Sequence, residues 1–103
     1  MEKLFDIFIN MINEKKYAAS HEILEPLWLK LKKEKNIKEA KLIQGIINGA
    51  VSLALYYEKN RIEPANRIWK VFEKYIYLVD ELDLEYNKYI LKAIYTIKEH
   101  KKF

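Results

Sequence analysis

Cysteine is absent from this sequence of 103 residues, which excludes disulfide bonds, thiolate metal ligands and thiol nucleophiles. A chain without cysteine fits a reducing compartment, so we expect the protein to be cytoplasmic. Glycine and proline are scarce, with two of each, and no glycine-rich phosphate loop or flexible linker interrupts the chain. We therefore expect residues 1–103 to form a single domain.

Long apolar runs are also lacking. The longest uncharged run, from Leu42 to Tyr57, has 16 residues, whereas a membrane-spanning helix needs about 20. The N-terminal stretch Met1–Asp6 has charges within its apolar residues and does not resemble a secretory signal. We expect no membrane association.

Neither sign of charge dominates. The 19 lysine and arginine residues exceed the 15 aspartate and glutamate residues, for a net charge of +4, but the two signs alternate along every amphipathic segment. A surface that follows a phosphate backbone needs basic residues gathered on one face. Nucleic-acid binding is therefore not expected.

What the sequence has is helical periodicity. Apolar residues recur three and four apart throughout, and no stretch alternates with the period of a strand. We predict an all-α fold, a compact multihelical bundle of about five helices. Asn13, Asn36 with Glu39, and Asp83 are expected to cap helices. The expected helices span about residues 2–12, 15–33, 37–59, 64–79 and 83–100.

The third predicted helix, at about 37–59, is expected to lie buried at the centre, because an uncharged helix must be covered on nearly every side. Gly45 and Gly49 weaken it as a helix, so we expect a neighbouring helix to approach closely there. Gln44, Asn48 and Ser52 follow one another four apart and are expected to share a face.

One constellation could carry chemistry. His21 and Glu25 project from the same face of the second helix, with Glu22 and Trp28 beside them. Imidazole and carboxylate can bind a metal ion or pass a proton. The metalloprotease motif His-Glu-x-x-His, however, would have a second histidine at Glu25. The other histidine, His100, is expected to be solvated among lysines.

Two interpretations of these residues remain open. In the first, His21 and Glu25 meet the polar stripe of Gln44, Asn48 and Ser52 in a hydrogen-bonded cluster that is buried or lines a cleft. In the second, His21 and Glu25 bind a divalent metal, the only cofactor considered, and Glu22 activates water in a small hydrolase. Pro26 either kinks the second helix or begins a new one.

The pattern Tyr17-x-x-x-His21-Glu22-x-Leu24-Glu25-x-x-Trp28, followed by a Gln-Gly segment, resembles the domain-of-unknown-function 309 family of small helical prokaryotic proteins. The resemblance implies a helical bundle with a buried central helix, and it supplies no activity. The positions that match the family pattern are His21, Glu22, Glu25, Trp28, Gln44 and Gly45, with Tyr17 as a further match.

Taken together, these patterns favour a binding or interaction module over an enzyme. The partner would be another protein or a second copy of the chain, held by exposed apolar or aromatic surface on the last two long helices.

Overall fold

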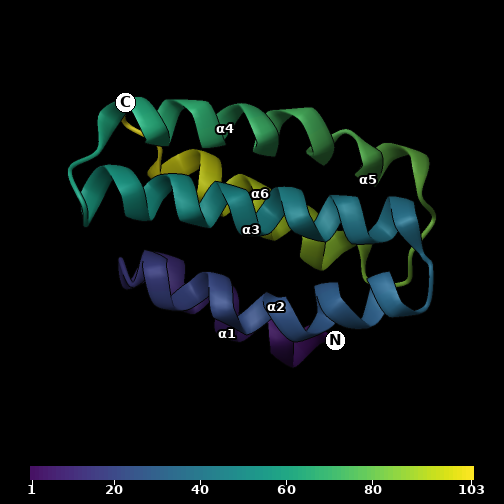
Figure 1. Cartoon of the computed structure of the whole chain (residues 1–103). Helices are drawn as coiled ribbons and strands as arrows, with labels where there is room; N and C mark the ends of the chain where they lie inside the picture. The colour runs from purple at the N-terminus through teal and green to yellow at the C-terminus, as the bar shows by residue number, and fades with distance from the viewer.

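The computed structural model describes all 103 residues and contains only helices and the turns that join them (Figure 1). The predicted all-α bundle is confirmed, with five long helices and a single-turn helix between the last two. None of the helices combines the length and the apolar character that a membrane-spanning helix requires. The helices are α1 (Glu2–Asn13), α2 (Tyr17–Lys33), α3 (Ile37–Tyr57), α4 (Ile62–Ile76), α5 (Leu78–Glu81) and α6 (Asn87–His100).

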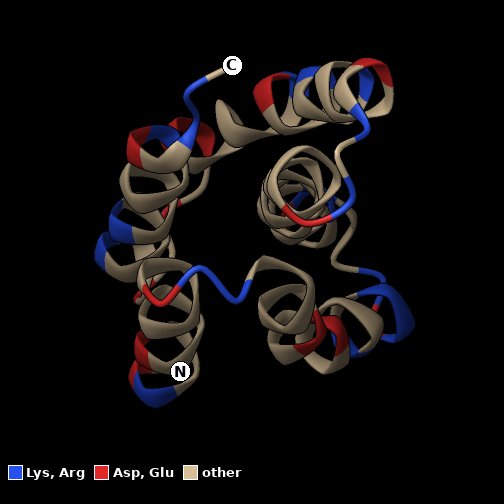
Figure 2. Ribbon diagram, turned by 90° about the vertical axis from the view of Figure 1, so that its left-hand side faces the viewer, with Lys and Arg blue, Asp and Glu red and all other residues tan.

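The helix α3 lies at the centre, as predicted, and contacts α2, α4, α5 and α6. In the end-on view of Figure 2, α4 lies above α3 and α2 lies below it, while α6 and α1 form the left-hand side. The charged residues colour the outer helices and turns, whereas α3 is tan apart from its ends. All six helices contribute side chains to one hydrophobic core.

Both glycines allow close packing against α3, as predicted. A Cβ atom on Gly45 would lie 2.9 Å from Cβ of Tyr75, and one on Gly49 would lie 2.6 Å from Cδ1 of Phe72. The Cβ atom on Gly49 would also lie 3.1 Å from the methyl carbon Cγ2 of Ile97. The bare backbone of α3 therefore brings α4, and at Gly49 also α6, within van der Waals distance.

The helix α2 continues through Pro26 without a break, so a new helix does not begin there. Proline lacks an N–H group and leaves the carbonyl four residues earlier without its helical donor. That carbonyl belongs to Glu22, whose side chain is exposed.

Two predicted caps are wrong. Asn13 is the last residue of α1 and its side chain contacts His100, whereas Lys16 occupies the N-cap of α2. Asp83 lies in the connection before α6, which begins four residues later at Asn87. Asn87 anchors this connection by donating through Nδ2 to the carbonyl oxygens of Val79 and Leu82.

The third expected cap is right in position only. Asn36 occupies the N-cap of α3 but its side chain makes no capping hydrogen bond. The carboxylate of Glu39 instead accepts a hydrogen bond from the hydroxyl of Tyr86. This contact ties the start of α3 to the start of α6.

Candidate functional site

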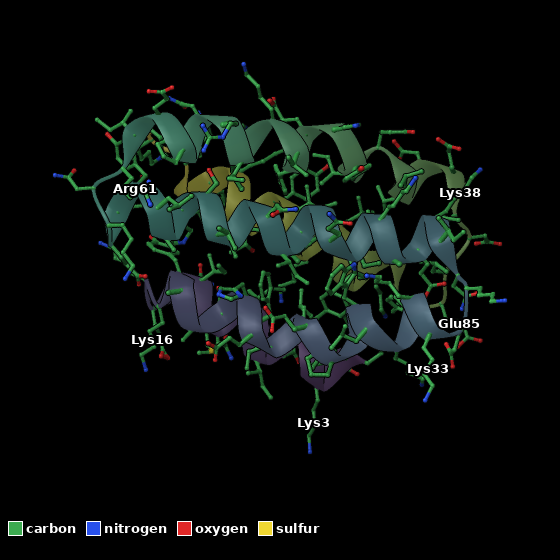
Figure 3. All side chains as sticks on the ribbon, in the orientation of Figure 1. Lys3, Lys16, Lys33, Lys38, Arg61 and Glu85 are labelled. Atoms are coloured by element: carbon green, nitrogen blue, oxygen red, sulfur yellow. The ribbon has the colours of Figure 1, made fainter.

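A surface that we call the seam follows the boundary between α2 and α3. It consists of two adjoining hollows of about 370 and 160 Å³, and both are lined by Trp28 and Gln44. Figure 3 shows the side chains of the two helices meeting along it, with Lys33 and Lys38 projecting outward beyond its right-hand end. The other lining residues are Lys32, Ile37, Ala40 and Lys41 in the larger hollow and Glu25, Ile47 and Asn48 in the smaller.

Helical geometry explains why these residues meet. Positions 25, 28 and 32 share one face of α2, and positions 41, 44 and 48 share one face of α3. The two helices run in opposite directions (Figure 1), so Trp28 meets Gln44 while Glu25 meets Asn48. Four residues singled out in the sequence thus lie together around one hollow.

His21 extends this row of side chains by one turn of α2. Its Nδ1 atom is buried and lies 3.3 Å from Oε1 of Glu25, but the two groups are not aligned for a hydrogen bond. The side chains of His21 and Glu25 are 27% and 48% exposed. The pair therefore borders an open surface and does not lie in the core.

The polar stripe on α3 divides between surface and core. Gln44 and Asn48 are half-buried and hydrogen-bond to no other protein group, whereas Ser52 is fully buried. The hydroxyl of Ser52 donates to the carbonyl oxygen of Ala65 in α4, with 2.6 Å between the oxygens. No hydrogen bond joins His21 or Glu25 to this stripe, so Ser52 serves the fold while the two amides remain available.

The remaining pattern residues lie apart from the seam. Glu22 is exposed and lines neither hollow, and Gly45 is buried against α4. No group of three or more His, Asp and Glu side chains lies close enough together to hold a metal ion. His21 and Glu25 would need a ligand from outside this chain to complete a metal site.

Charge is distributed unevenly along the seam. Lys32 and Lys41 line the end near the α2–α3 turn, and Glu25 lines the opposite end. The ammonium group of Lys32 lies 4.4 Å from the ring centroid of Trp28, close enough for a cation–π interaction. The seam thus presents an aromatic ring beside positive charge, with two free amides next to it.

A second cluster, which the sequence did not reveal, surrounds Tyr17 and His100. The Tyr17 hydroxyl oxygen lies 2.9 Å from Nδ1 of His100, and Nε2 of His100 lies 3.1 Å from Oδ1 of Asn13. Their cleft of about 590 Å³ is also lined by Lys15, Tyr57, Glu58, Glu99 and Lys102. The expectation that His100 is solvated is wrong, because the end of α6 packs against the α1–α2 turn.

Electrostatics agree with this geometry. Burial lowers the pKa of His100 from its ordinary value, and the positive charges of Lys15 and Lys102 lower it further against the opposing effect of Glu99. A neutral imidazole that carries its proton on Nε2 can donate to Asn13 and accept from Tyr17 at once. Burial also raises the pKa of Tyr17, with smaller contributions from Tyr57 and Glu58, so its hydroxyl keeps its proton.

Comparison with known proteins gives one match. A family model described as "Domain of unknown function (DUF309)" matches residues 5–68, which is more than half of the chain. This range contains every residue of the seam. No curated protein and no solved structure matches the chain.

Proposed function

This chain belongs to the DUF309 family of domains of unknown function, and from its seam we propose that it is a module that binds an extended peptide segment of a partner protein. The observation that carries the proposal is the pair of side-chain amides of Gln44 and Asn48, which line a hollow without a hydrogen-bond partner in the protein. Each amide can donate one hydrogen bond to a peptide group and accept one from it.

The spacing of the amides suits an extended chain. Residues four apart on a helix are separated by about 6 Å along its axis, and alternate residues of an extended peptide are separated by about 6.6 Å. Gln44 and Asn48 can therefore contact the backbone of two alternate residues of one peptide. Backbone hydrogen bonds of this kind give affinity, and side-chain pockets add specificity.

Trp28 and the lysines define the preferred peptide. The half-buried indole ring offers apolar surface for one side chain of the ligand. Lys32 and Lys41 then favour an acidic side chain at the end of the seam near the α2–α3 turn. We propose a partner segment with an apolar residue and a neighbouring acidic residue, bound in the cytoplasm, the reducing compartment that a chain without cysteine fits.

Selection from a library of random peptides displayed on phage tests this proposal. The wild-type protein should enrich peptides that combine an apolar and an acidic residue, and a synthetic copy of an enriched peptide should bind in calorimetry. The Gln44→Ala/Asn48→Ala double variant should bind that copy at least about tenfold more weakly, since each lost hydrogen bond contributes about 1 kcal/mol. Alanine favours a helix, so circular dichroism should show an unchanged fold.

The matched control is Asn66→Ala, which removes an exposed amide from α4, away from the seam. This variant should bind the peptide as the wild type does. The proposal is contradicted if no peptide is enriched over an unrelated protein, or if the double variant retains full affinity for the enriched peptide.

A further inference from the structure

Another hollow, of about 300 Å³, lies between α4–α5 and α6 and shares no residue with the seam. In Figure 2, α4 and α6 lie above and to the left of the bundle axis, whereas α2 lies below α3, so the two surfaces face different directions. We call this hollow the α4–α6 groove. One wall is formed by Glu73, Tyr77 and Asp80, and the other by Leu91, Tyr95 and Lys98.

The α4–α6 groove carries some of the largest exposed apolar side chains of the molecule. Tyr77 is 55% exposed, Tyr95 is 61% exposed and Leu91 is 37% exposed. The two tyrosine rings stack on no other ring, and their hydroxyl groups make no hydrogen bond within the chain. Large apolar side chains gathered on one exposed surface mark interaction sites.

The charged residues of the groove also lack partners. Glu73 and Asp80 stand on one wall and Lys98 on the other, and none of them forms an ion pair within the chain. Acidic and basic groups on opposite walls make the surface complementary to itself. A partner that repeats the same surface, turned around, can pair Lys98 on one wall with Glu73 on the other in both copies.

We propose that a second copy of this chain covers the α4–α6 groove in a two-fold symmetric dimer. Because α4 and α6 run in opposite directions (Figure 1), Lys98 near the end of α6 lies at the same end of the groove as Glu73. A two-fold axis parallel to the groove places the α6 wall of one copy over the α4–α5 wall of the other without shifting it along the groove. Such an interface contains every contact twice.

This arrangement fixes the contacts across the interface. Lys98 of each copy faces Glu73 of the other, which gives two equivalent ion pairs. Tyr95 and Leu91 of each copy cover Tyr77 of the other, so the exposed rings become buried farther along the groove than the two ion pairs. The seam lies outside the interface in both copies and stays open to its peptide. The proposed dimer does not depend on the peptide binding proposed for the seam.

Sedimentation velocity over a concentration series, up to the highest soluble concentration, tests the dimer. The wild-type chain should sediment as a dimer, and Tyr95→Lys should sediment as a monomer, because it places charge in the apolar centre. Tyr95 is exposed in the single chain, so this variant should fold normally by circular dichroism. A wild-type chain that remains a monomer at every concentration overturns the proposal and leaves the groove to a different partner.

Charge reversal tests the symmetry itself. Lys98→Glu and Glu73→Lys should each weaken the dimer by about tenfold, since each places like charges opposite one another in both of the symmetry-related pairs. The combined variant Glu73→Lys/Lys98→Glu restores both pairs with reversed polarity and should recover the wild-type dimer. Lys92→Glu, an exposed reversal on α6 that does not line the groove, should have no effect. A dimer that ignores the single reversals, or that the combined variant fails to recover, contradicts the proposed interface.

Discussion

The hydroxyl group of Tyr17 donates a hydrogen bond to the imidazole of His100, 83 residues later in the chain, across 2.9 Å. This contact joins the first turn of α2 to the last turn of α6. The carbonyl oxygen of His100 also accepts a hydrogen bond from Tyr57 at the end of α3. With Asn13 at the end of α1, four helix ends therefore meet at one histidine, and its neutral state matters for the stability of the fold.

Stability should accordingly fall in mild acid. The pKa of His100 is lower in the folded chain than its ordinary value of 6.5, so the unfolded chain binds more protons and the free energy of unfolding decreases as the pH drops from about 7 to about 5. Urea denaturation at several pH values should show this loss for the wild type. His100→Gln should show a smaller loss over the same interval.

The matched control for this experiment is His21→Gln, which removes the other histidine and leaves the Tyr17 contact in place. In the His21→Gln variant, His100 should still contribute to the pH dependence of the free energy of unfolding. An equal decline in the free energy of unfolding for the wild type and for His100→Gln would contradict this prediction. It would mean that protonation of His100 does not destabilise the fold.

Adding a methyl group to Gly49 should destabilise the protein. Alanine favours the helix by about 1 kcal/mol relative to glycine, but the new Cβ atom would lie 2.6 Å from the buried ring of Phe72, and overpacking of this kind costs about 1–3 kcal/mol. We expect Gly49→Ala to lower the free energy of unfolding by up to about 2 kcal/mol in urea denaturation.

The sign of that change is decisive. If α4 and α6 did not approach α3 at Gly49, helix propensity alone would act and the alanine variant would be more stable than the wild type. A control in the same helix is Lys41→Ala, at an exposed position, which should leave stability almost unchanged.

Replacing a turn lysine by glycine should stabilise the protein. Lys35 has a φ of 61° between α2 and α3, a left-handed conformation that costs a residue with a side chain about 1 kcal/mol and costs glycine almost nothing. Lys35→Gly should therefore raise the free energy of unfolding by about 0.5–1 kcal/mol. Lys33→Gly, two residues earlier in the last turn of α2, should lower it instead. Equal effects of the two substitutions would show that the backbone conformation at Lys35 carries no strain.

Much of the fold follows from sequence pattern. Apolar spacing located the five long helices, and the uncharged run in α3 identified the central one. The spacing of Gly45 and Gly49 indicated a close helix contact. These features depend on short-range periodicity, which a sequence displays directly.

The parts that could not be predicted depend on contacts between distant residues. Nothing near Asn13 or His100 in the sequence shows that the two side chains meet, because their contact requires α6 to return to the α1–α2 turn. The left-handed conformations of Lys15 and Lys35 could not be predicted either. Glycine or asparagine usually occupies such a position, and a lysine gives no indication of it.

Only part of the candidate site could be predicted from the sequence, and the reason is geometric. Gln44, Asn48 and Ser52 follow one another four apart, but a helix of 3.6 residues per turn rotates position 52 by about 80° relative to position 44. That rotation turns Ser52 toward α4 and leaves Gln44 facing the seam. Spacing alone could not show on which side of this divide each polar side chain lies.

The most direct test of the peptide-binding seam is a titration of ¹⁵N-labelled protein with an enriched peptide, followed by NMR. Gln44 is the only glutamine in the sequence and Trp28 is one of two tryptophans, so their side-chain signals are easily assigned. We predict that the Gln44 amide and Trp28 indole signals shift together with one dissociation constant, while the indole signal of Trp69, which is buried outside the seam, stays in place. A Gln44 signal that does not move at peptide saturation would contradict the central claim.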